Sequence, residues 1–175
     1  KKLAANLGFE EAPQSLTATQ YSFLDSKGGE LRIDIDTGNF SFTKTESTES
    51  ARFDENYFSD QPKVVDDFKR YLSNKRLLKD DLKEGPSKIF LNQPSIREST
   101  KADVSIWQSK VDETPIITPK FNKGLINVTV NKNIDDDERY LNLEYIYWPI
   151  DLNNVGTYPL KKPDQAFEDL KSGNA

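Results

Sequence analysis

Strict alternation between apolar and charged residues marks the stretch Glu30-Leu31-Arg32-Ile33-Asp34-Ile35-Asp36. Successive side chains of a β-strand point to opposite faces, so Leu31, Ile33 and Ile35 would share one face and the charged residues the other. One buried face and one solvated face are typical of an antiparallel sheet. The stretch therefore predicts a half-buried antiparallel strand, and the neighbouring segments can be placed relative to it.

The segments around this strand predict three more elements of one unit: a helix over residues 3–7, a strand over 19–24 and a strand over 40–42. Gly8 suits the end of the helix, because glycine takes positive φ without strain. Gly28 and Gly38 suit the turns between the strands for the same reason. We expect an N-terminal unit, residues 1–45, made of one helix and three antiparallel strands.

A longer helix is predicted over residues 61–78. Pro62 suits its first turn, and Val64, Phe68 and Leu72 fall on one stripe of the helix surface. Strand signals then resume over residues 88–92, 102–110, 114–118, 125–131 and 139–148, and a short helix is predicted over 163–173. This second unit spans residues 61–175.

The two halves repeat one order, a helix followed by an antiparallel meander. The predicted fold class is α+β, with two helix-plus-antiparallel-sheet units, a long central helix and a short C-terminal helix. Residues 46–60 are rich in Ser, Thr and Glu and are interpreted as a linker. Because 175 residues are few for two separate cores, a single shared core is the alternative.

The composition excludes several classes of function. The chain has no cysteine and no histidine, which removes disulfides, thiol nucleophiles, the Ser-His-Asp triad and the commonest metal ligand. A net charge of −5 and a pI of about 4.9 argue against nucleic-acid binding. No motif marks a pair among the 29 acidic residues. We therefore predict a protein that is not an enzyme, with no catalytic residues, no cofactor and no metal site.

Two acidic strings are candidate calcium sites. Asp34, Asp36 and Asn39 lie between strands and lack the remaining ligands of an EF-hand loop, so a β-turn is the preferred interpretation. Asp135-Asp136-Asp137-Glu138 reads as a solvated hairpin loop. Weak Ca²⁺ binding at residues 135–138 is the less favoured alternative.

Aromatic residues are the remaining candidates for a binding surface. They gather late in the sequence, at Trp107, Tyr145, Tyr147, Trp148 and Tyr158. Packing in the core and between strands is one interpretation, and an aromatic contact surface for a partner is the other.

Two segments resemble a known group of bacterial proteins. One comprises residues 102–108, 111–117 and 124–130. The other runs from Tyr147-Trp148-Pro149-Ile150-Asp151 through Thr157-Tyr158-Pro159-Leu160 to the stretch 163–173. Together they resemble the extracytoplasmic YycH/YycI regulators and the PepSY-like domains. The resemblance implies PepSY-like units, a single N-terminal membrane anchor, action through protein contacts, and no catalytic residues to carry over.

The first hypothesis is thus a non-catalytic, extracytoplasmic interaction domain, attached to the cytoplasmic membrane by an N-terminal segment outside this chain. Its partner would be a protein of the membrane or cell envelope. A module that binds cell-wall glycans or peptides through the aromatic residues is the second hypothesis. A hydrolase using two carboxylates is the third.

Overall fold

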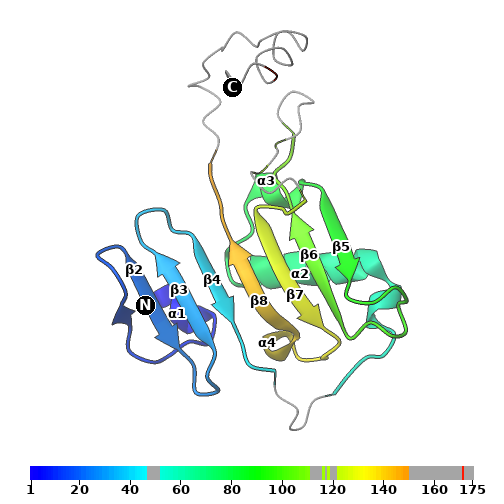
Figure 1. The fold of residues 1–175 in the computed structure, drawn as a ribbon, viewed down its shortest axis with the longest axis horizontal. Coiled ribbons are helices and arrows are strands. Elements are labelled where there is room, and N and C mark those ends of the chain that lie inside the picture. The colour runs from blue at the N-terminus through cyan, green and yellow to red at the C-terminus, as the bar shows by residue number, and fades with distance from the viewer. Residues whose placement is uncertain (47–51, 111–115, 117, 119–121, 150–170, 172–175) are drawn as a thin grey trace.

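The computed structural model describes residues 1–46, 52–110, 116, 118, 122–149 and 171. It has an α+β fold built on one antiparallel sheet of eight strands, in the order β1-β2-β3-β4-β8-β7-β6-β5 (Figure 1). The strands are β1 (Gln14–Ser15), β2 (Gln20–Leu24), β3 (Glu30–Asp34), β4 (Phe40–Thr43), β5 (Ser87–Leu91), β6 (Lys101–Ile106), β7 (Ile126–Asn131) and β8 (Tyr140–Tyr145). The helices are α1 (Lys2–Asn6), the 3₁₀-helix η1 (Tyr57–Ser59), α2 (Gln61–Asn74), α3 (Asp80–Lys83) and α4 (Asp136–Arg139).

The two predicted units meet in the middle of this sheet. Strand β4, the last strand of the first unit, pairs with β8, the last strand of the second, with Phe40 opposite Tyr145 and Phe42 opposite Leu143. The rings of Phe40 and Tyr145 stack with their centroids 4.9 Å apart. Among the described residues, the first unit (1–45) and the second unit (61–175) therefore contribute four strands each to one continuous sheet.

The helices cover one face of the sheet. Figure 1 shows α1 and α2 behind the strands, with α2 crossing the half formed by β5 to β8. Nearly all of the buried apolar side chains that the structure describes form one cluster, which includes Leu31 and Phe42 from one half and Val104 and Val128 from the other. The shared core, which the sequence left as an alternative, is the arrangement found.

Helix α2 begins as predicted and ends earlier. The Asp60 carboxylate accepts a hydrogen bond from the Lys63 N–H at 3.1 Å, which caps the first turn. The helix stops at Asn74, four residues before its predicted end at Leu78. Arg76 adopts φ +60°, and the Leu77 N–H bonds back to the Leu72 carbonyl. This is a Schellman end, formed without the glycine that usually signals one.

Part of the predicted linker packs into the core. Tyr57 and Phe58 in η1 are 3% and 0% exposed, and Phe53 forms a bridge with Asn133. Two adjacent aromatic side chains bury enough apolar surface to fix a segment whose other residues are polar. Residues 47–51 lie outside the described part of the chain.

Several local predictions need correction or fall outside the described residues. Strand β3 ends at Asp34, so Ile35, predicted on the buried face, lies in the turn and is 56% exposed. The predicted acidic hairpin loop contains helix α4, and a bulge between Thr129 and Val130 shifts the pairing beside Tyr140. Most of the predicted strand over 114–118 and, apart from Lys171, of the predicted helix over 163–173 lies outside the described residues.

Candidate functional site

The face of the sheet opposite the helices is polar. Period-two alternation puts the apolar residues of each central strand against the helices and leaves their neighbours on this open face. The open-face residues of the four central strands are Ser41 and Thr43 of β4, Asn142 and Glu144 of β8, Asn127 and Thr129 of β7, and Asp103 and Ser105 of β6.

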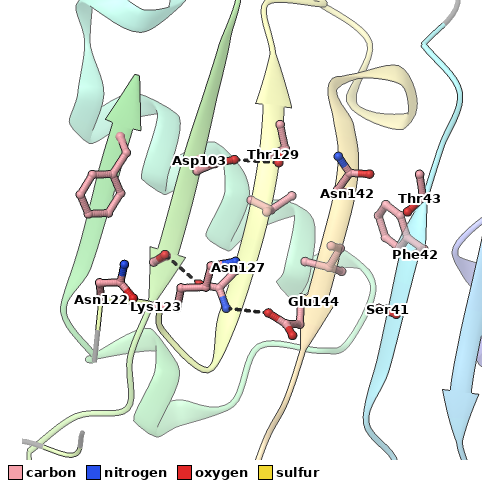
Figure 2. A pocket seen from close by; sticks show the side chains of 14 residues that line it. Ser41, Phe42, Thr43, Asp103, Asn122, Lys123, Asn127, Thr129, Asn142 and Glu144 are labelled. Carbon is pink, nitrogen blue, oxygen red and sulfur yellow. Dashed lines mark hydrogen bonds between the residues drawn. The ribbon is translucent and has the colours of Figure 1, made fainter. Parts of the chain in front are cut away.

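These residues line a groove with a volume of about 490 Å³, hereafter the open-face groove. Figure 2 shows it crossing the strands from β5 to β4. Phe90 stands at its β5 end, and Asn122 and Lys123 form a rim before β7. A second hollow of about 260 Å³ shares Ser41 and Glu144 with it. The groove has the size of a small-molecule or short-chain binding site.

The floor of the groove is held in place by Asn127. Its side-chain oxygen accepts from the Ser105 hydroxyl at 2.8 Å and from the Gly124 N–H at 3.0 Å. Its side-chain NH₂ donates to the Gly124 carbonyl at 2.8 Å and to Glu144 at 3.4 Å. Asn127 therefore fixes the turn that carries Asn122 and Lys123.

Gly124 is required at this turn by close packing. A Cβ atom there would lie 2.2 Å from the Ile106 carbonyl oxygen of β6. Only glycine lets the chain pass this close to the neighbouring backbone. The rim of the groove is thus set by one glycine and one asparagine.

Other groups in the groove keep hydrogen-bonding capacity for a partner. Within the part of the chain that the structure describes, no hydrogen bond engages the side chains of Ser41, Thr43 or Asn142, and all three are exposed. Asp103 accepts from the Thr129 hydroxyl at 2.7 Å (Figure 2), which uses one of the roughly four lone-pair positions of a carboxylate.

The two acids of the groove are engaged separately. Asp103 is bonded to Thr129 and Glu144 to Asn127, which stand two positions apart along β7. Asp103 and Glu144 are themselves separated by the whole of β7. Two carboxylates that are to act on one bond must face that bond from both sides. The contacts described here hold each acid to the strand between them.

The described aromatic residues predicted to form a contact surface lie in different parts of the fold. Tyr145 is 6% exposed on the helix side, and its hydroxyl donates to the Leu77 carbonyl at 2.8 Å. Burial raises the pKa of this hydroxyl to about 12. The Tyr147 hydroxyl donates to Asp81 at 3.0 Å. Tyr145 thus belongs to the core cluster, and Tyr147 packs against it while partly exposed.

The remaining aromatic candidates lie apart from the groove. Trp148 is 54% exposed and Trp107 is partly buried, and neither ring stacks on another among the described residues. The Trp148 carbonyl instead accepts a hydrogen bond from the buried Gln108 side chain at 3.0 Å. Tyr158 lies outside the described residues. Two aromatic residues that were not among the predicted set, Phe42 and Phe90, line the groove.

The acidic string at residues 135–138 is bound within the protein. The Asp135 carboxylate caps α4 by accepting from the Asp137 N–H at 2.9 Å. Three cations pair with the others: Arg139 with Asp136 at 2.8 Å, Lys75 with Asp137 at 3.5 Å, and Lys27 with Glu138. In the described ranges no three acidic side chains converge as metal ligands.

The Asp34 string also forms a turn. Asp34 accepts from the N–H groups of Asp36 and Thr37 at 3.0 and 3.1 Å. These hydrogen bonds, that of Thr37 first, lower the pKa of Asp34. The contacts match the preferred interpretation of a β-turn.

Comparisons with protein-family models, with curated proteins and with solved structures found no match to this chain. Across the described ranges, no helix combines the length and apolar character that a bilayer crossing requires. The site must therefore be interpreted from its own chemistry.

Sequence reasoning missed the groove residues. Each lies at a polar position of an alternating strand, where a solvated face is the ordinary expectation. The available signal was the side-chain type, since Ser, Thr and Asn recur at these positions in three different strands.

Proposed function

We propose that this chain is a non-catalytic binding domain that holds its partner in the open-face groove. The observation that carries the proposal is the groove itself, which places Ser41, Thr43 and Asn142 in a hollow of about 490 Å³ with their hydrogen-bonding groups unused. Convergent polar groups in a concavity of this size are typical of a binding site.

The rigidity of the surrounding sheet supports this role. All four central strands have a strand neighbour on each side, and the Asn127 hydrogen bonds fix the rim. A partner would meet side chains whose positions are already set, which reduces the entropic cost of binding.

The resemblance to the YycH/YycI regulators and PepSY-like domains supplies a biological setting for the proposal. In that setting the chain consists of two PepSY-like units, lies outside the cytoplasm on a membrane tether, and meets a protein of the membrane or cell envelope. Reading the codons upstream of Lys1 tests the tether. An apolar run of about 20 residues preceded by Lys or Arg is expected, and a start codon immediately before Lys1 would contradict it.

The groove is tested by photo-crosslinking in cells that make the protein naturally. A photoreactive amino acid replaces Asn142 in the groove and, in a matched control, the exposed Asn74 on the helix side. We expect an adduct from position 142 that is absent from position 74 and is abolished by Thr43→Arg, which would fill the groove with a long cationic side chain. Equal adducts at both positions would contradict the proposal, as would the absence of an adduct at position 142 together with the absence of any ligand that binds in the groove.

A further inference from the structure

The chemistry of the groove narrows the class of ligand, granted the proposed function that the groove is the binding site. We infer that it binds a neutral, linear oligosaccharide laid across strands β4, β8, β7 and β6. The inference depends on four features of the described residues. These are their free hydrogen-bonding groups, the spacing of the strands, the pairing of the backbone N–H and C=O groups with neighbouring strands, and the charge of the groove.

The free polar groups match those of a sugar. The hydroxyls of Ser41 and Thr43 each donate and accept, and the Asn142 amide carries two donors and an acceptor in one plane. A sugar hydroxyl also donates and accepts at once. Neighbouring sugar hydroxyls can therefore bridge to an amide or to the carboxylate of Asp103, which still has lone pairs available beyond its bond with Thr129.

The strand spacing matches a chain of sugar rings. Strands in a sheet lie about 4.8 Å apart, roughly the length of one pyranose unit along its chain. Asn142 of β8 pairs with Thr43 of β4 on one side and with Thr129 of β7 on the other. A chain crossing the strands would thus meet one polar side chain for each sugar unit.

An extended peptide fits this surface less well. Peptides that join a sheet do so at an exposed edge, where backbone N–H and C=O groups are unpaired. The four strands under the groove are central, so their backbone groups already pair with neighbouring strands. The groove therefore presents polar side chains to a ligand and no unpaired backbone groups. A ligand rich in hydroxyls can form hydrogen bonds with these side chains.

Phe90 and the charged side chains of the groove also suit a neutral oligosaccharide. Phe90 lines the β5 end of the groove and is 40% exposed, so it offers an apolar contact to the C–H face of a sugar ring. The Lys88 ammonium lies 4.8 Å from the centroid of the same ring. Asp103 and Glu144 lie in the groove and Lys123 at its rim, a balance that disfavours strongly anionic chains.

The inference is tested by titrating the ¹⁵N-labelled chain with chitohexaose, cellohexaose and maltohexaose while amide shifts are followed by NMR. We expect at least one of them to bind with a Kd of about 1 mM or tighter and to shift amides of β4, β7 and β8. It should be recovered uncleaved. Asn142→Ala and Thr43→Val should each weaken binding about five- to tenfold, as expected for the loss of one or two hydrogen bonds.

Asn74→Ala is the matched control, because it removes an exposed asparagine from the opposite side of the molecule. It should leave the affinity unchanged, and the ¹⁵N spectra of all three variants should confirm that they are folded. Phe90→Ala should weaken binding and remove the shift changes at the β5 end only.

The outcomes separate this inference from the proposed function. If no hexasaccharide binds but an adduct still forms from position 142, the groove holds a different class of partner and the oligosaccharide inference is overturned. Shift changes around Trp148 instead of the groove would also overturn it. If neither a hexasaccharide nor a crosslinked partner is found at the groove, both proposals fall.

Discussion

A single buried carboxylate ties the central helix to the segment before β8. Asp67 of α2, with a side chain 5% exposed, lies 2.8 Å from Lys63, 2.8 Å from Arg70 and 3.7 Å from Arg139. Arg139 also donates to the carbonyls of Asn133 and Ile134, at 2.7 and 2.8 Å. The ion pairs thereby fix the loop from which β8 enters the centre of the sheet.

The pKa of Asp67 shows that the neighbouring cations outweigh the effect of burial. Burial opposes ionisation of the carboxyl, but the hydrogen bond from Lys63 and the charges of Lys63, Arg70 and Arg139 outweigh it, so the pKa is lowered. A carboxyl with a lowered pKa in the folded state stabilises the fold above its ordinary pKa of about 3.9. That stabilisation is lost as the pH falls through the folded-state pKa.

Replacing Asp67 with Asn should therefore destabilise the protein in a pH-dependent way. We expect a loss of about 1–3 kcal/mol at pH 7, because Lys63, Arg70 and Arg139 each lose a charged partner, while Asp136 still pairs with Arg139. The difference from wild type should be smaller at pH 3 than at pH 7, because pH 3 lies below the ordinary carboxyl pKa of about 3.9 and the unfolded wild-type chain binds a proton there that the lowered pKa of Asp67 opposes in the folded state. Urea unfolding at both pH values measures it.

The matched control for this substitution is Asp66→Asn, one residue away on the exposed side of α2. It should change the free energy of unfolding by less than about 0.5 kcal/mol. An equal loss for Asp66→Asn, or a loss for Asp67→Asn that is the same at pH 3, would show that the ion pairs are not the cause.

Among the elements, the connection into β7 is sensitive to substitution because it passes close to the backbone of β6. Gly124→Ala would bring a methyl group to 2.2 Å from the Ile106 carbonyl oxygen, which belongs to the ladder between β6 and β7. We expect a destabilisation of about 1–3 kcal/mol, as for other overpacked sites, together with altered amide shifts at Asn122 and Lys123. Thermal unfolding and NMR spectra measure the two effects.

Asn122→Ala is the control for the Gly124 substitution. Asn122 is exposed on the same rim, so its loss should leave the melting temperature within a degree or two of wild type. A Gly124→Ala protein as stable as this control would mean that the backbone at Ile106 yields to the added methyl group.

Sequence patterns predicted most elements because their signals are local. Alternation located β3, a run of mostly apolar and β-branched residues located β7, and the apolar stripe with its Pro62 start located α2. The end of α2 was missed because arginine rarely takes the positive φ found at Arg76. Local patterns carry little information about such an exception.

Features that join distant segments were not predictable in this way. Neither the pairing of β4 with β8 nor the approach of Arg139 to Asp67 leaves a trace in the local pattern. The open-face groove exists only once four strands are in register. Tyr145 was named as a candidate contact, but it shares its face with the buried Leu143 and so lies under the helices.

At the scale of the whole molecule, the single sheet implies a single cooperative unit. Leu31 of β3 and Val128 of β7 belong to one core cluster, connected through Phe42 of β4 and Leu143 of β8. Separate opening of the two halves would expose this shared interface.

Native-state hydrogen exchange should thus report one opening free energy for the amides of Leu31 and Val128. Phe42→Leu, which trims the side chain between the two halves, should lower both values equally, by about 1–2 kcal/mol. If the amides of β3 lose protection while those of β7 keep it, the halves open independently and residues 1–45 form a unit of their own.

The pairing of β4 with β8 also has a consequence for how the chain is made. Strand β4 ends at Thr43, and its partner spans Tyr140–Tyr145. At synthesis rates of about 5–20 residues per second, the roughly 100 intervening residues take about 5–20 s to emerge from the ribosome. During that interval the nascent β4 edge has no partner strand, so the newborn chain spends several seconds as a substrate for chaperones or for aggregation.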